Sequence, residues 1–466
     1  MIAISLQEIA EVISAKLIGD GTSVVAGSVE TDSRQIKTGS LFVAKPGEVT
    51  DGHEYVPDAI ANGAVALIVE REVKSEVPQL VVKDSVLALG MLAKHVVAKV
   101  KTIGQLKVVG VTGSNGKTTT KNMLREVLSI AGKTVAPEES FNNEVGAPYS
   151  MLKIDEQTRF LVVEMGAGGP GTIKYLAEMC EPDLGIELKV GLAHAGEFGG
   201  IEATENIKAE LVEELSASGI ALLNLDDERV MNMSSRTKAK VITFGLGKDS
   251  DYSASNVSIS LSGTSFEYST PDGTTSRVNL QILGEHHVYN ALAALTTAEL
   301  LGVDRSKAIQ ALEDMKLAEK WRMELNVAKS GLTVINDAYN ASPDSMRAAL
   351  QTLAQLGRIS GKKTVAVMGE MAELGEFSAH EHDAIGRIAV RLNLGQVVVV
   401  GKGAKLIHMG ASQEGSWDGE SQYFDEISNA LAYLREMLTG DEIVLVKSSK
   451  SANLRFLGDD LLKENQ

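Results

Sequence analysis

The chain has 466 residues, of which 45 are lysine or arginine and 62 are aspartate or glutamate, so its formal net charge is −17. At about 150 residues per domain, this length predicts roughly three domains. An acidic surface repels nucleic acid and anionic membranes, so we expect neither as a partner. Cys180 is the only cysteine, which excludes an internal disulfide and a cysteine-built metal site and is typical of a reducing compartment.

The first residues have the pattern of an amphipathic surface helix. Ser5 and Glu8 fit a capping box at its start. Apolar residues then recur at helical spacing, at Leu6, Ile9, Ile13 and Leu17. The charged residues between them argue against a signal peptide, and no apolar stretch has the length of a membrane span. We therefore expect a cytoplasmic protein without membrane insertion.

Residues 1–104 are expected to form a small N-terminal α/β domain. Asp32, Ser33 and Arg34 precede a turn and a strand near residues 41–44. This segment can be a solvated turn with a local ion pair. It can also be an anion or nucleotide-edge site in which the forked guanidinium of Arg34 is the donor. Both interpretations stay open on these residues alone.

A glycine-rich segment lies at the start of the second expected domain, residues 105–316. An apolar run ends at Val109, a glycine-rich turn follows, and a helical pattern begins near Lys117. The glycines let backbone N–H groups converge on a phosphate, the helix N-terminus adds partial positive charge, and Lys117 adds a full one. Thr118 can offer its hydroxyl to Mg²⁺. This order predicts a polyphosphate site at Gly113, Ser114, Asn115, Gly116, Lys117, Thr118 and Thr119.

In the rest of this domain predicted strands alternate with predicted helices, which indicates a doubly wound α/β sheet around the phosphate loop. Helical stretches separate the candidate parallel strands, which lie at 106–111, 160–165, 184–188, 219–224 and 240–244. Residues 251–281 alternate between polar and apolar and turn near Gly273, which predicts an antiparallel patch appended to the sheet. A helix near 288–301 closes the domain.

Three residues of this domain are candidates for carrying chemistry. Glu164 ends a candidate strand, where an open α/β sheet places its ligands, and it can either ligate a hard cation or cap a helix. His194 follows the next strand and is either a ligand or a satisfied polar residue. Lys208 lies beside the buried stripe of a helix, three residues from Glu205. Spacing alone indicates a solvated lysine.

Residues 317–466 are expected to form a C-terminal Rossmann-like α/β domain. Ser342 before Pro343 predicts the cap of a helix, and apolar strands are predicted at 332–336, 364–368, 396–400 and 443–447. Arg322 precedes the first of these strands and Asp337 follows it. An arginine from a separate domain can neutralise a transferring phosphoryl group, and an acid at a strand tip can bind ribose hydroxyls.

Taken together, these motifs resemble those of the Mur ligases of bacterial peptidoglycan synthesis, in particular the MurF type that adds D-alanyl-D-alanine. The resemblance extends over all three expected domains. The matching motifs are Asp32–Arg34, Asp51–His53, Thr112–Thr119, Asn142–Gly146, Glu164–Ala167, His194 with Glu197–Gly199, Lys208, His287–Ala291, Arg322–Glu324, Asp337–Pro343 and Gly369–Gly375. The sequence departs from the family where Gly168 and Thr172 replace an arginine and a histidine, and where Ser448 and Lys450 replace a glycine and an arginine.

The resemblance implies roles for these residues. It places ATP on Gly113–Thr119, Asn290, Arg322 and Asp337, and UDP-N-acetylmuramoyl-tripeptide on Ser33, Arg34, Asn142 and Asn143. It places D-alanyl-D-alanine near Asn340, Glu373 and Leu374, and Mg²⁺ on Thr118, Glu164, His194 and Lys208. Lys208 matches a lysine that family members carbamylate, which turns a cation into an anionic ligand. The implied catalytic residues are Lys117, Lys208, His194 and Arg322, and we expect a monomer.

The reaction that the resemblance implies is ATP-dependent amide formation. The tripeptide carboxylate attacks the γ-phosphorus to give an acyl phosphate, and the dipeptide amine then displaces phosphate. Mg²⁺, Lys117 and Arg322 cancel negative charge, and because Lys117 and Arg322 belong to different domains we expect domain closure on ATP. Alternatives are another Mur enzyme, a folylpolyglutamate synthase, a P-loop GTPase or small-molecule kinase, and a relative that only binds nucleotide. Asn224–Asp227 lacks the lysine of a guanine-reading motif.

Overall fold

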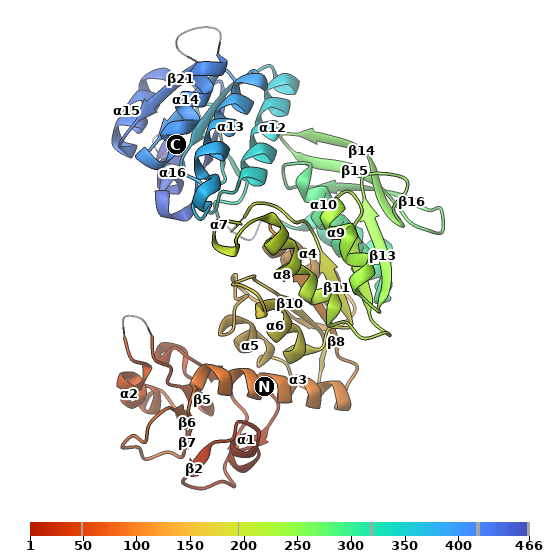
Figure 1. Cartoon of the computed structure of the whole chain (residues 1–466), viewed down its shortest axis with the longest axis vertical. Coiled ribbons are helices and arrows are strands. Elements are labelled where there is room, and N and C mark those ends of the chain that lie inside the picture. Colours follow the sequence, from red (N-terminus) through yellow and green to blue (C-terminus); the bar gives the residue numbers. More distant parts are fainter. Residues whose placement is uncertain (48–49, 194, 317–319, 416–419, 464–466) are drawn as a thin grey trace.

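The computed structural model describes residues 1–47, 50–193, 195–316, 320–415 and 420–463. Its strands form three large sheets and one small two-stranded sheet. The three large sheets follow one another along the long axis of the molecule, from red and orange through yellow and green to blue (Figure 1). This arrangement confirms the predicted architecture of three α/β units.

The N-terminal sheet has five strands in the order β2-β7-β6-β5-β4. β2 is antiparallel to β7, and the other neighbouring strands are parallel. The elements are β1 (Ile4–Ser5), α1 (Leu6–Val12), β2 (Lys16–Ile18), β3 (Val24–Val25), β4 (Val29–Glu30), β5 (Ser40–Val43), α2 (Val56–Ala61), β6 (Ala64–Val69) and β7 (Gln79–Val81).

The predicted N-terminal helix is shorter than its apolar pattern indicates. The Ser5 hydroxyl accepts a hydrogen bond from the Glu8 backbone N–H at 3.2 Å, which confirms the predicted helix start. The helix α1 ends at Val12, and Ser14 then adopts a left-handed φ of 53° that turns the chain. The expectation that Leu17 belongs to this helix is wrong, because Leu17 lies in β2 and pairs with Leu80 of β7.

A long helix, α3 (Ser85–Ile103), lies between the N-terminal sheet and the central part of the molecule (Figure 1). Its residue Leu92 belongs to a hydrophobic core that also contains Ile9 of α1 and Leu176 of α6 (Thr172–Cys180). Gly90 permits the close approach of α3 to α6, because a Cβ atom there would overlap the Tyr175 hydroxyl. The N-terminal and central parts are therefore joined by one continuous core.

The central sheet has nine strands in the order β16-β15-β14-β13-β12-β11-β8-β10-β9. Its neighbours from β9 through β14 are parallel, whereas β15 pairs antiparallel with both β14 and β16. The antiparallel patch was predicted at this place. The strands are β8 (Lys107–Thr112), β9 (Lys133–Val135), β10 (Thr158–Glu164), β11 (Leu184–Glu187), β12 (Ile220–Asn224), β13 (Lys240–Gly245), β14 (Tyr252–Ser260), β15 (Gly263–Ser269) and β16 (Thr275–Leu280).

Helices cover both faces of the parallel part of this sheet. Val109 and Val111 of β8 enter a core with α4, α10 and α11, whereas Val108 enters the core that contains α3, α6 and part of α8. Alternate residues of β8 are therefore buried on opposite faces, which explains why this strand is a nearly continuous apolar run. The helices of this part are α4 (Lys117–Ser129), α5 (Gly146–Met151), α6, α7 (Ala195–Phe198), α8 (Ile201–Glu213), α9 (Glu228–Asn232), α10 (His286–Leu300) and α11 (Arg305–Asp314).

The C-terminal sheet has six strands in the order β17-β18-β22-β19-β20-β21, all parallel to their neighbours except β17. The sequence did not predict the edge strands β17 and β21, because most of their residues are only half-buried and form no apolar run. The elements are β17 (Glu324–Val327), β18 (Thr333–Asn336), α12 (Pro343–Ser360), β19 (Lys363–Met368), α13 (Ser378–Arg391), β20 (Gln396–Val400), α14 (Lys405–Glu414), β21 (Ser421–Phe424), α15 (Ile427–Met437), β22 (Glu442–Lys447) and α16 (Leu454–Lys463).

Two further features of the fold concern its helices and its single cysteine. Among the described residues, no helix has both the length and the apolar character that crossing a membrane needs. Cys180, at the end of α6, is fully buried, and this burial raises the pKa of its thiol to about 12.

Candidate active site

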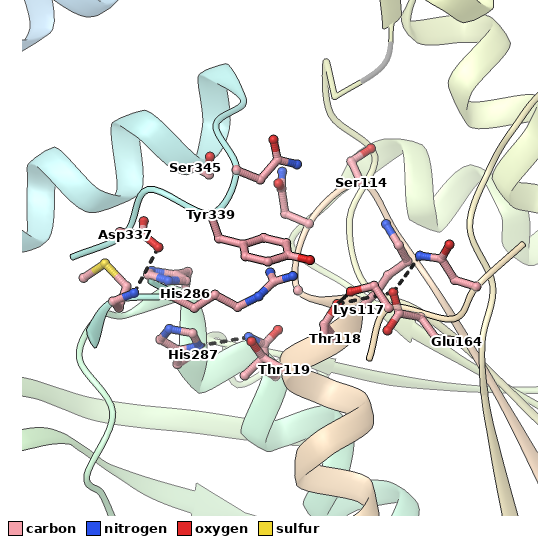
Figure 2. A pocket seen from close by; sticks show the side chains of 18 of the residues that line it. Ser114, Lys117, Thr118, Thr119, Glu164, His286, His287, Asp337, Tyr339 and Ser345 are labelled. Atoms are coloured by element: carbon pink, nitrogen blue, oxygen red, sulfur yellow. Dashed lines mark hydrogen bonds between the residues drawn. The ribbon is translucent and has the colours of Figure 1, made fainter. Parts of the chain in front are cut away.

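A polar cavity of about 270 Å³ lies where the central part meets the C-terminal part. Its central wall is formed by the loop before α4, by the end of β10 and by the start of α10. Its other wall comes from the segments around Arg322, Asp337 and Lys447. Figure 2 shows Asp337 and Tyr339 opposite Thr118 and the neighbouring loop.

The glycine-rich loop takes a shape that only glycine accommodates at two positions. Gly113 has φ +149° and Gly116 has φ +87°, and a Cβ atom on Gly116 would lie 2.5 Å from Oδ1 of Asn290. Ser114 anchors the loop to the neighbouring strand end, because its hydroxyl accepts a hydrogen bond from the Gly191 backbone N–H at 2.8 Å. The loop leads directly into α4, which begins at Lys117. The predicted strand, turn and helix are thus confirmed.

Lys117 is half-buried and lines this cavity. Its Nζ donates a hydrogen bond to the Gly113 carbonyl at 2.6 Å. Burial lowers the pKa of Lys117, Glu164 opposes this shift by attraction, and Arg322 adds to it by repulsion. Two cations, one at the start of α4 and one from the C-terminal part, therefore face the same cavity. An anion there would relieve their desolvation and mutual repulsion.

Thr118 and Glu164 present oxygen atoms on one side of the cavity. The Thr118 hydroxyl lies 3.3 Å from Oε1 of Glu164, which also accepts a hydrogen bond from the Asn142 side chain at 2.9 Å. The second oxygen of Glu164, Oε2, is buried and has no hydrogen-bond partner among the described residues. A buried carboxylate oxygen beside a hydroxyl is a donor set that suits a hard cation.

Lys208 is buried, with 2% of its surface exposed, so the interpretation as a solvated lysine is wrong. Glu205 pairs instead with Arg229, at 3.8 Å. Burial lowers the pKa of the Lys208 ammonium, Lys117 adds to this shift, and Glu187 opposes it. Burial in turn raises the pKa of Glu187, whose two carboxylate oxygens lack hydrogen-bond partners in the part of the chain that the structure describes. Local spacing did not reveal this environment, because Glu187 comes from a different element, β11.

The C-terminal part brings a stacked cation to the cavity. The guanidinium of Arg322 lies 4.2 Å from the centre of the Tyr339 ring, and Nζ of Lys450 lies 5.3 Å from the same ring. Tyr339 thus contacts both cations, a favourable arrangement between positive charge and an aromatic face. The ring therefore fixes where Arg322 enters the site.

Asp337 and Lys447 form a buried ion pair at 2.5 Å across neighbouring strand ends. The same Lys447 amine donates to the Asn340 carbonyl at 3.2 Å, and Asp337 accepts a hydrogen bond from the Met323 backbone N–H at 3.0 Å. This network ties the segment that carries Arg322 to the tips of β18 and β22. Asp337 and Asn340 both line the cavity, at the strand tip where the sequence placed them.

Two contacts join the phosphate-loop side to the C-terminal part. The Ser342 hydroxyl, which caps α12 as predicted, lies 3.1 Å from Oδ1 of Asn115. Nearby, Lys189 forms an ion pair with Asp344 at 3.3 Å. The N-terminus of α12 is therefore docked on the loop that surrounds Lys117.

Asn290 lies on α10, beside the loop. Its Nδ2 lies 3.1 Å from Nδ1 of His287, and it lines both the main cavity and a smaller one of about 170 Å³. The smaller cavity is also bordered by Lys189, Asp226 and Tyr289. Asn115 and Gly116 of the glycine-rich loop line it as well.

A second large cavity, of about 640 Å³, lies between the N-terminal sheet and the central part. Asn142 and Asn143 line it, together with Asp32. Ser33 is buried, and the exposed Arg34 forms an ion pair with Asp32 at 2.7 Å. The local ion pair considered for this turn is thus present, whereas the anion-binding role of Ser33 and Arg34 stays a prediction.

The other expected substrate residues lie at the edge of the site. Leu374 is buried, and the chain at Gly375 packs against Gly196 of α7. Glu373 has a left-handed φ of 65°. Neither Glu373 nor Leu374 lines the main cavity, which Asn340 does.

One expected ligand and one departure from the family concern the loops around the site. His194 lies outside the described residues.

Thr172 donates a hydrogen bond to the Gly169 carbonyl at 2.7 Å and accepts one from the Gly168 N–H at 3.1 Å. Gly168 and Thr172, the two residues that differ from the family pattern, therefore form hydrogen bonds within their own loop. Within the described ranges, no three His, Cys, Asp or Glu side chains are grouped as a ready metal site.

Several residues of the site were not singled out from the sequence. Lys447 and Glu187 each end an apolar strand, so the rule that placed Glu164 could have found them. His286 begins α10 and its Nδ1 is buried without a hydrogen-bond partner in the described structure. Ser140 lines both the main cavity and the second cavity but stands in a loop with no distinguishing pattern.

Comparison with known proteins gives consistent matches along the chain. Three family models match: one described as Mur ligase family, catalytic domain, at residues 26–99, one as Mur ligase middle domain at 111–298, and one as Mur ligase, glutamate ligase domain, at 321–450. A Mycobacterium leprae (strain TN) protein named UDP-N-acetylmuramoyl-tripeptide–D-alanyl-D-alanine ligase is 37% identical, over 99% of each chain.

Solved structures agree with this match. The MurF ligase from Thermotoga maritima in complex with ADP superposes with a TM-score of 0.80 at 28% identity, covering 95% of this chain and 98% of that one. An Acinetobacter baumannii structure named UDP-N-acetylmuramoylalanyl-D-glutamyl-2,6-diaminopimelate–D-alanyl-D-alanyl ligase gives a TM-score of 0.84 at 31% identity, over 99% of this chain and 98% of that one.

Proposed function

Because this chain belongs to the Mur ligase family, we propose that it is the ATP-dependent ligase that joins D-alanyl-D-alanine to a UDP-N-acetylmuramoyl-tripeptide. The reaction belongs to peptidoglycan precursor synthesis, and we place it in the cytoplasm and on a monomer. The observation that carries the proposal is the single cavity that holds both Lys117 and Arg322, from opposite sides of the site. Charge of this kind is needed where a carboxylate meets a triphosphate.

We assign ATP to the main cavity. The loop from Gly113 to Thr119 is shaped for the phosphates, with Lys117 beneath them and Arg322 opposite. Asn290 and Asp337 are assigned to the adenosine, because both line the cavity that contains the loop and Asn290 also lines the smaller cavity beside it. The T. maritima relative, which shares this fold, is described as a complex with ADP, and this supports the assignment of an adenine nucleotide.

We assign Mg²⁺ to Thr118 and Glu164, with His194 and Lys208 as further ligands. This assignment rests on Oε2 of Glu164, which is buried and has no hydrogen-bond partner among the described residues, and on the neighbouring hydroxyl of Thr118. When bound, the ion supplies positive charge to phosphate oxygens. Lys208 cannot ligate a cation as an ammonium. Its burial favours the neutral amine, which is the form that adds CO₂ to give a carbamate and a proton, and the carbamate is an oxygen ligand.

We assign the remaining substrates to the surrounding segments. The domain that contains residues 1–104 would hold the UDP end of the tripeptide substrate, with Ser33 and Arg34 as its contacts. Neither residue lines the second cavity, but their neighbour Asp32 does, and Asn142 and Asn143 of the central part line it as the further contacts. The central domain, residues 105–316, would hold ATP. The C-terminal domain, residues 317–466, would hold the dipeptide near Asn340, Glu373 and Leu374.

The reaction then proceeds in two steps. The terminal carboxylate of the tripeptide attacks the γ-phosphorus of ATP, so that an acyl–phosphate bond forms and the bond to ADP breaks. Lys117 and Arg322 hold the phosphate oxygens and offset their negative charge. The amine of D-alanyl-D-alanine next attacks the acyl carbon, phosphate leaves, and a proton leaves the amine. The walls that close around the cavity keep water from the acyl phosphate.

The deciding experiment measures phosphate release from ATP with UDP-muramoyl-tripeptide, with and without D-alanyl-D-alanine. We expect release that depends on both substrates, with formation of the pentapeptide product. ATP turnover that requires no amine acceptor would instead indicate a small-molecule kinase. Use of a single amino acid in place of the dipeptide would indicate another Mur enzyme or a folylpolyglutamate synthase.

A further inference from the structure

The loop Gly369–Gly375, which carries Glu373 and Leu374, is held at its base by two buried side chains from different elements. The first is His382 of α13, which has none of its surface exposed. The second is Ser449, which follows β22. Neither side chain lines any of the three cavities described above, so an effect on a substrate must pass through the loop.

Consecutive residues of the loop form hydrogen bonds with these two holders. The Met371 backbone N–H donates to Nε2 of His382 at 3.0 Å. The Ala372 N–H donates to the Ser449 hydroxyl at 2.8 Å, and the Ser449 N–H donates to the Glu370 carbonyl at 2.9 Å. Three residues in a row are therefore fixed relative to α13 and to the end of β22.

The partners of the His382 ring determine where its proton lies. Nε2 carries no proton, because it accepts the Met371 N–H. Nδ1 lies 2.7 Å from the Ser378 carbonyl oxygen, which can only accept, so Nδ1 carries the proton. A second proton, on Nε2, would set two donors against each other and leave the buried Met371 N–H without its acceptor. Only the neutral ring can hold the loop.

Beyond this base, the loop is strained and reaches the central part. Glu373 has a left-handed φ of 65°, a shape that costs energy for a residue with a Cβ atom and persists only where the surroundings hold it. Leu374 is buried, and Gly375 packs against Gly196 of α7, which lies beside the C-terminal part (Figure 1). The hydrogen bonds at the base therefore oppose relaxation of this tip.

We infer that His382 is a positioning residue for dipeptide binding: its neutral ring holds the loop in the shape that receives the dipeptide, and a second proton on the ring releases the loop. The inference rests on the proposed function, which places D-alanyl-D-alanine near Glu373 and Leu374. Because His382 lies outside the cavities, its effect should appear in the affinity for the dipeptide and not in the chemical step.

The surroundings of the ring set the pH at which the loop is released. Burial lowers the pKa of His382, whereas the Ser378 carbonyl and the negative charges of Glu370 and Glu381 oppose this shift. These two glutamates are the charged groups that act on the ring among the described residues, and Glu381 is itself paired with Arg347 of α12 at 2.5 Å. The net shift is downward from 6.5, so the ring gains its second proton only at acidic pH.

Binding of D-alanyl-D-alanine to the full-length protein tests this role. It is measured by calorimetric titration with a non-hydrolysable ATP analogue and UDP-muramoyl-tripeptide present. His382→Leu removes the acceptor and should weaken dipeptide binding about three- to tenfold. His382→Gln supplies an amide oxygen that can accept the same N–H and does not titrate, so at neutral pH its affinity should stay within about twofold of the unaltered protein.

The pH dependence separates positioning from packing alone. The Kd of the unaltered protein divided by that of His382→Gln should be constant at neutral pH. It should rise at the pH where ¹⁵N NMR of labelled histidines shows His382 gaining its second proton. Titration of the dipeptide amine cancels in this ratio. His380→Gln, at an exposed position on the same helix, is the matched control and should change neither the affinity nor its pH dependence.

Hydrogen exchange tests the loop in the absence of substrates. The amides of residues 369–375 should exchange faster in His382→Leu than in the unaltered protein or in His382→Gln. If His382→Leu does not fold, the Kd ratio with His382→Gln still decides.

The outcomes separate the inference from the function on which it rests. Equal exchange in the three proteins, a Kd ratio that stays flat while the ring is protonated, or a ring that keeps a single proton down to pH 5 overturns the inference, even where the enzyme forms product. Failure to form amide overturns the proposed function, while the exchange rates still decide whether His382 holds the loop.

Discussion

The Ser342 hydroxyl lies 3.1 Å from Oδ1 of Asn115, so the residue that caps α12 also contacts the phosphate loop. The same hydroxyl accepts a hydrogen bond from the Ser345 backbone N–H at 3.3 Å. One side chain thus begins a helix of the C-terminal part and docks that helix on the central part. The position of the ATP loop and the position of the C-terminal part are coupled through this contact.

Ser342→Ala should remove both interactions. We expect a loss of about 1 kcal/mol in unfolding free energy from the missing cap, and a several-fold higher KM for ATP because the loop is no longer held. Ser342→Gly is the matched variant, since glycine is nearly as good a cap and costs only a few tenths of a kcal/mol. Denaturant unfolding and steady-state kinetics check both. Equal ATP affinity in all three proteins would contradict the coupling.

Gly116→Ala should damage the phosphate loop directly. The residue has φ +87°, and the added methyl would lie 2.5 Å from Oδ1 of Asn290. We expect about 1–2 kcal/mol of destabilisation from the left-handed backbone alone, together with at least about tenfold weaker ATP binding, the equivalent of roughly 1.4 kcal/mol. Calorimetric titration with ATP measures the loss. Gly247→Ala, where no atom lies within 4 Å of the new methyl, should bind ATP normally.

Lys208→Ala should abolish most activity, and short carboxylates such as formate or acetate should restore part of it by replacing the carbamate. Lys117→Ala is the control, because its role is that of a cation and no added anion can replace it. Incorporation of ¹³C-bicarbonate, seen as a carbamate signal in the NMR spectrum of the unaltered protein and absent from Lys208→Ala, gives a readout independent of turnover. Full activity of Lys208→Ala would remove the carbamate role.

Stability should fall at mildly acidic pH because of His286. Burial lowers the pKa of His286 to about 4, Asp337 opposes the shift, and Lys447 and Lys189 add to it. Between pH 6.5 and 4 the unfolded chain binds a proton that the folded protein does not, so the folded state loses stability as the pH falls through this window.

The variant His286→Gln isolates this contribution. The unfolding free energy of the unaltered protein minus that of the variant should be constant above pH 7. It should decrease by up to about 3 kcal/mol towards pH 4, as 1.36 kcal/mol per pKa unit requires. Urea unfolding at a series of pH values measures it. A difference that stays flat down to pH 4 would show that His286 does not titrate in this way.

Closure of the C-terminal part on ATP is the remaining prediction. The continuous core around α3 joins the N-terminal and central parts, so we expect the movement at the other junction, where Ser342 meets Asn115. Small-angle scattering should give a smaller radius of gyration with an ATP analogue and UDP-muramoyl-tripeptide than without them. Arg322→Ala should reduce this compaction. Identical scattering curves with and without ligands would rule out closure.

The sequence predicted the parts of the site whose position depends on residues close together in the chain. The phosphate loop, Glu164 at its strand end and the Ser342 cap each depend on a strand or helix boundary that apolar periodicity places well. The burial of Lys208 was missed because it depends on the packing of α8 against the sheet, and its companion Glu187 belongs to another element. The ion pair of Asp337 with Lys447 joins strands distant in sequence, which no local pattern reports.

For the fold, too, the sequence predicted the features set by local pattern and missed those set by contacts distant in sequence. Strands buried on both faces were predicted because they form apolar runs. The edge strands β17 and β21 were not predicted, since most of their residues are only half-buried. The N-terminal helix was overextended because Leu17 continues a helical spacing that the turn at Ser14 interrupts. Pairing with β7 outweighs the local preference there.

The burial of Cys180 makes the chain well suited to fluorescence labelling. Cys180 lies at the end of α6, its side chain is buried, and the pKa of its thiol is raised to about 12. It therefore forms almost no thiolate at neutral pH and should resist maleimide reagents. Two cysteines introduced on the surfaces of the central and C-terminal parts would then be the reactive thiols of the molecule. A donor and an acceptor dye attached to them could report the opening and shutting of the enzyme one molecule at a time.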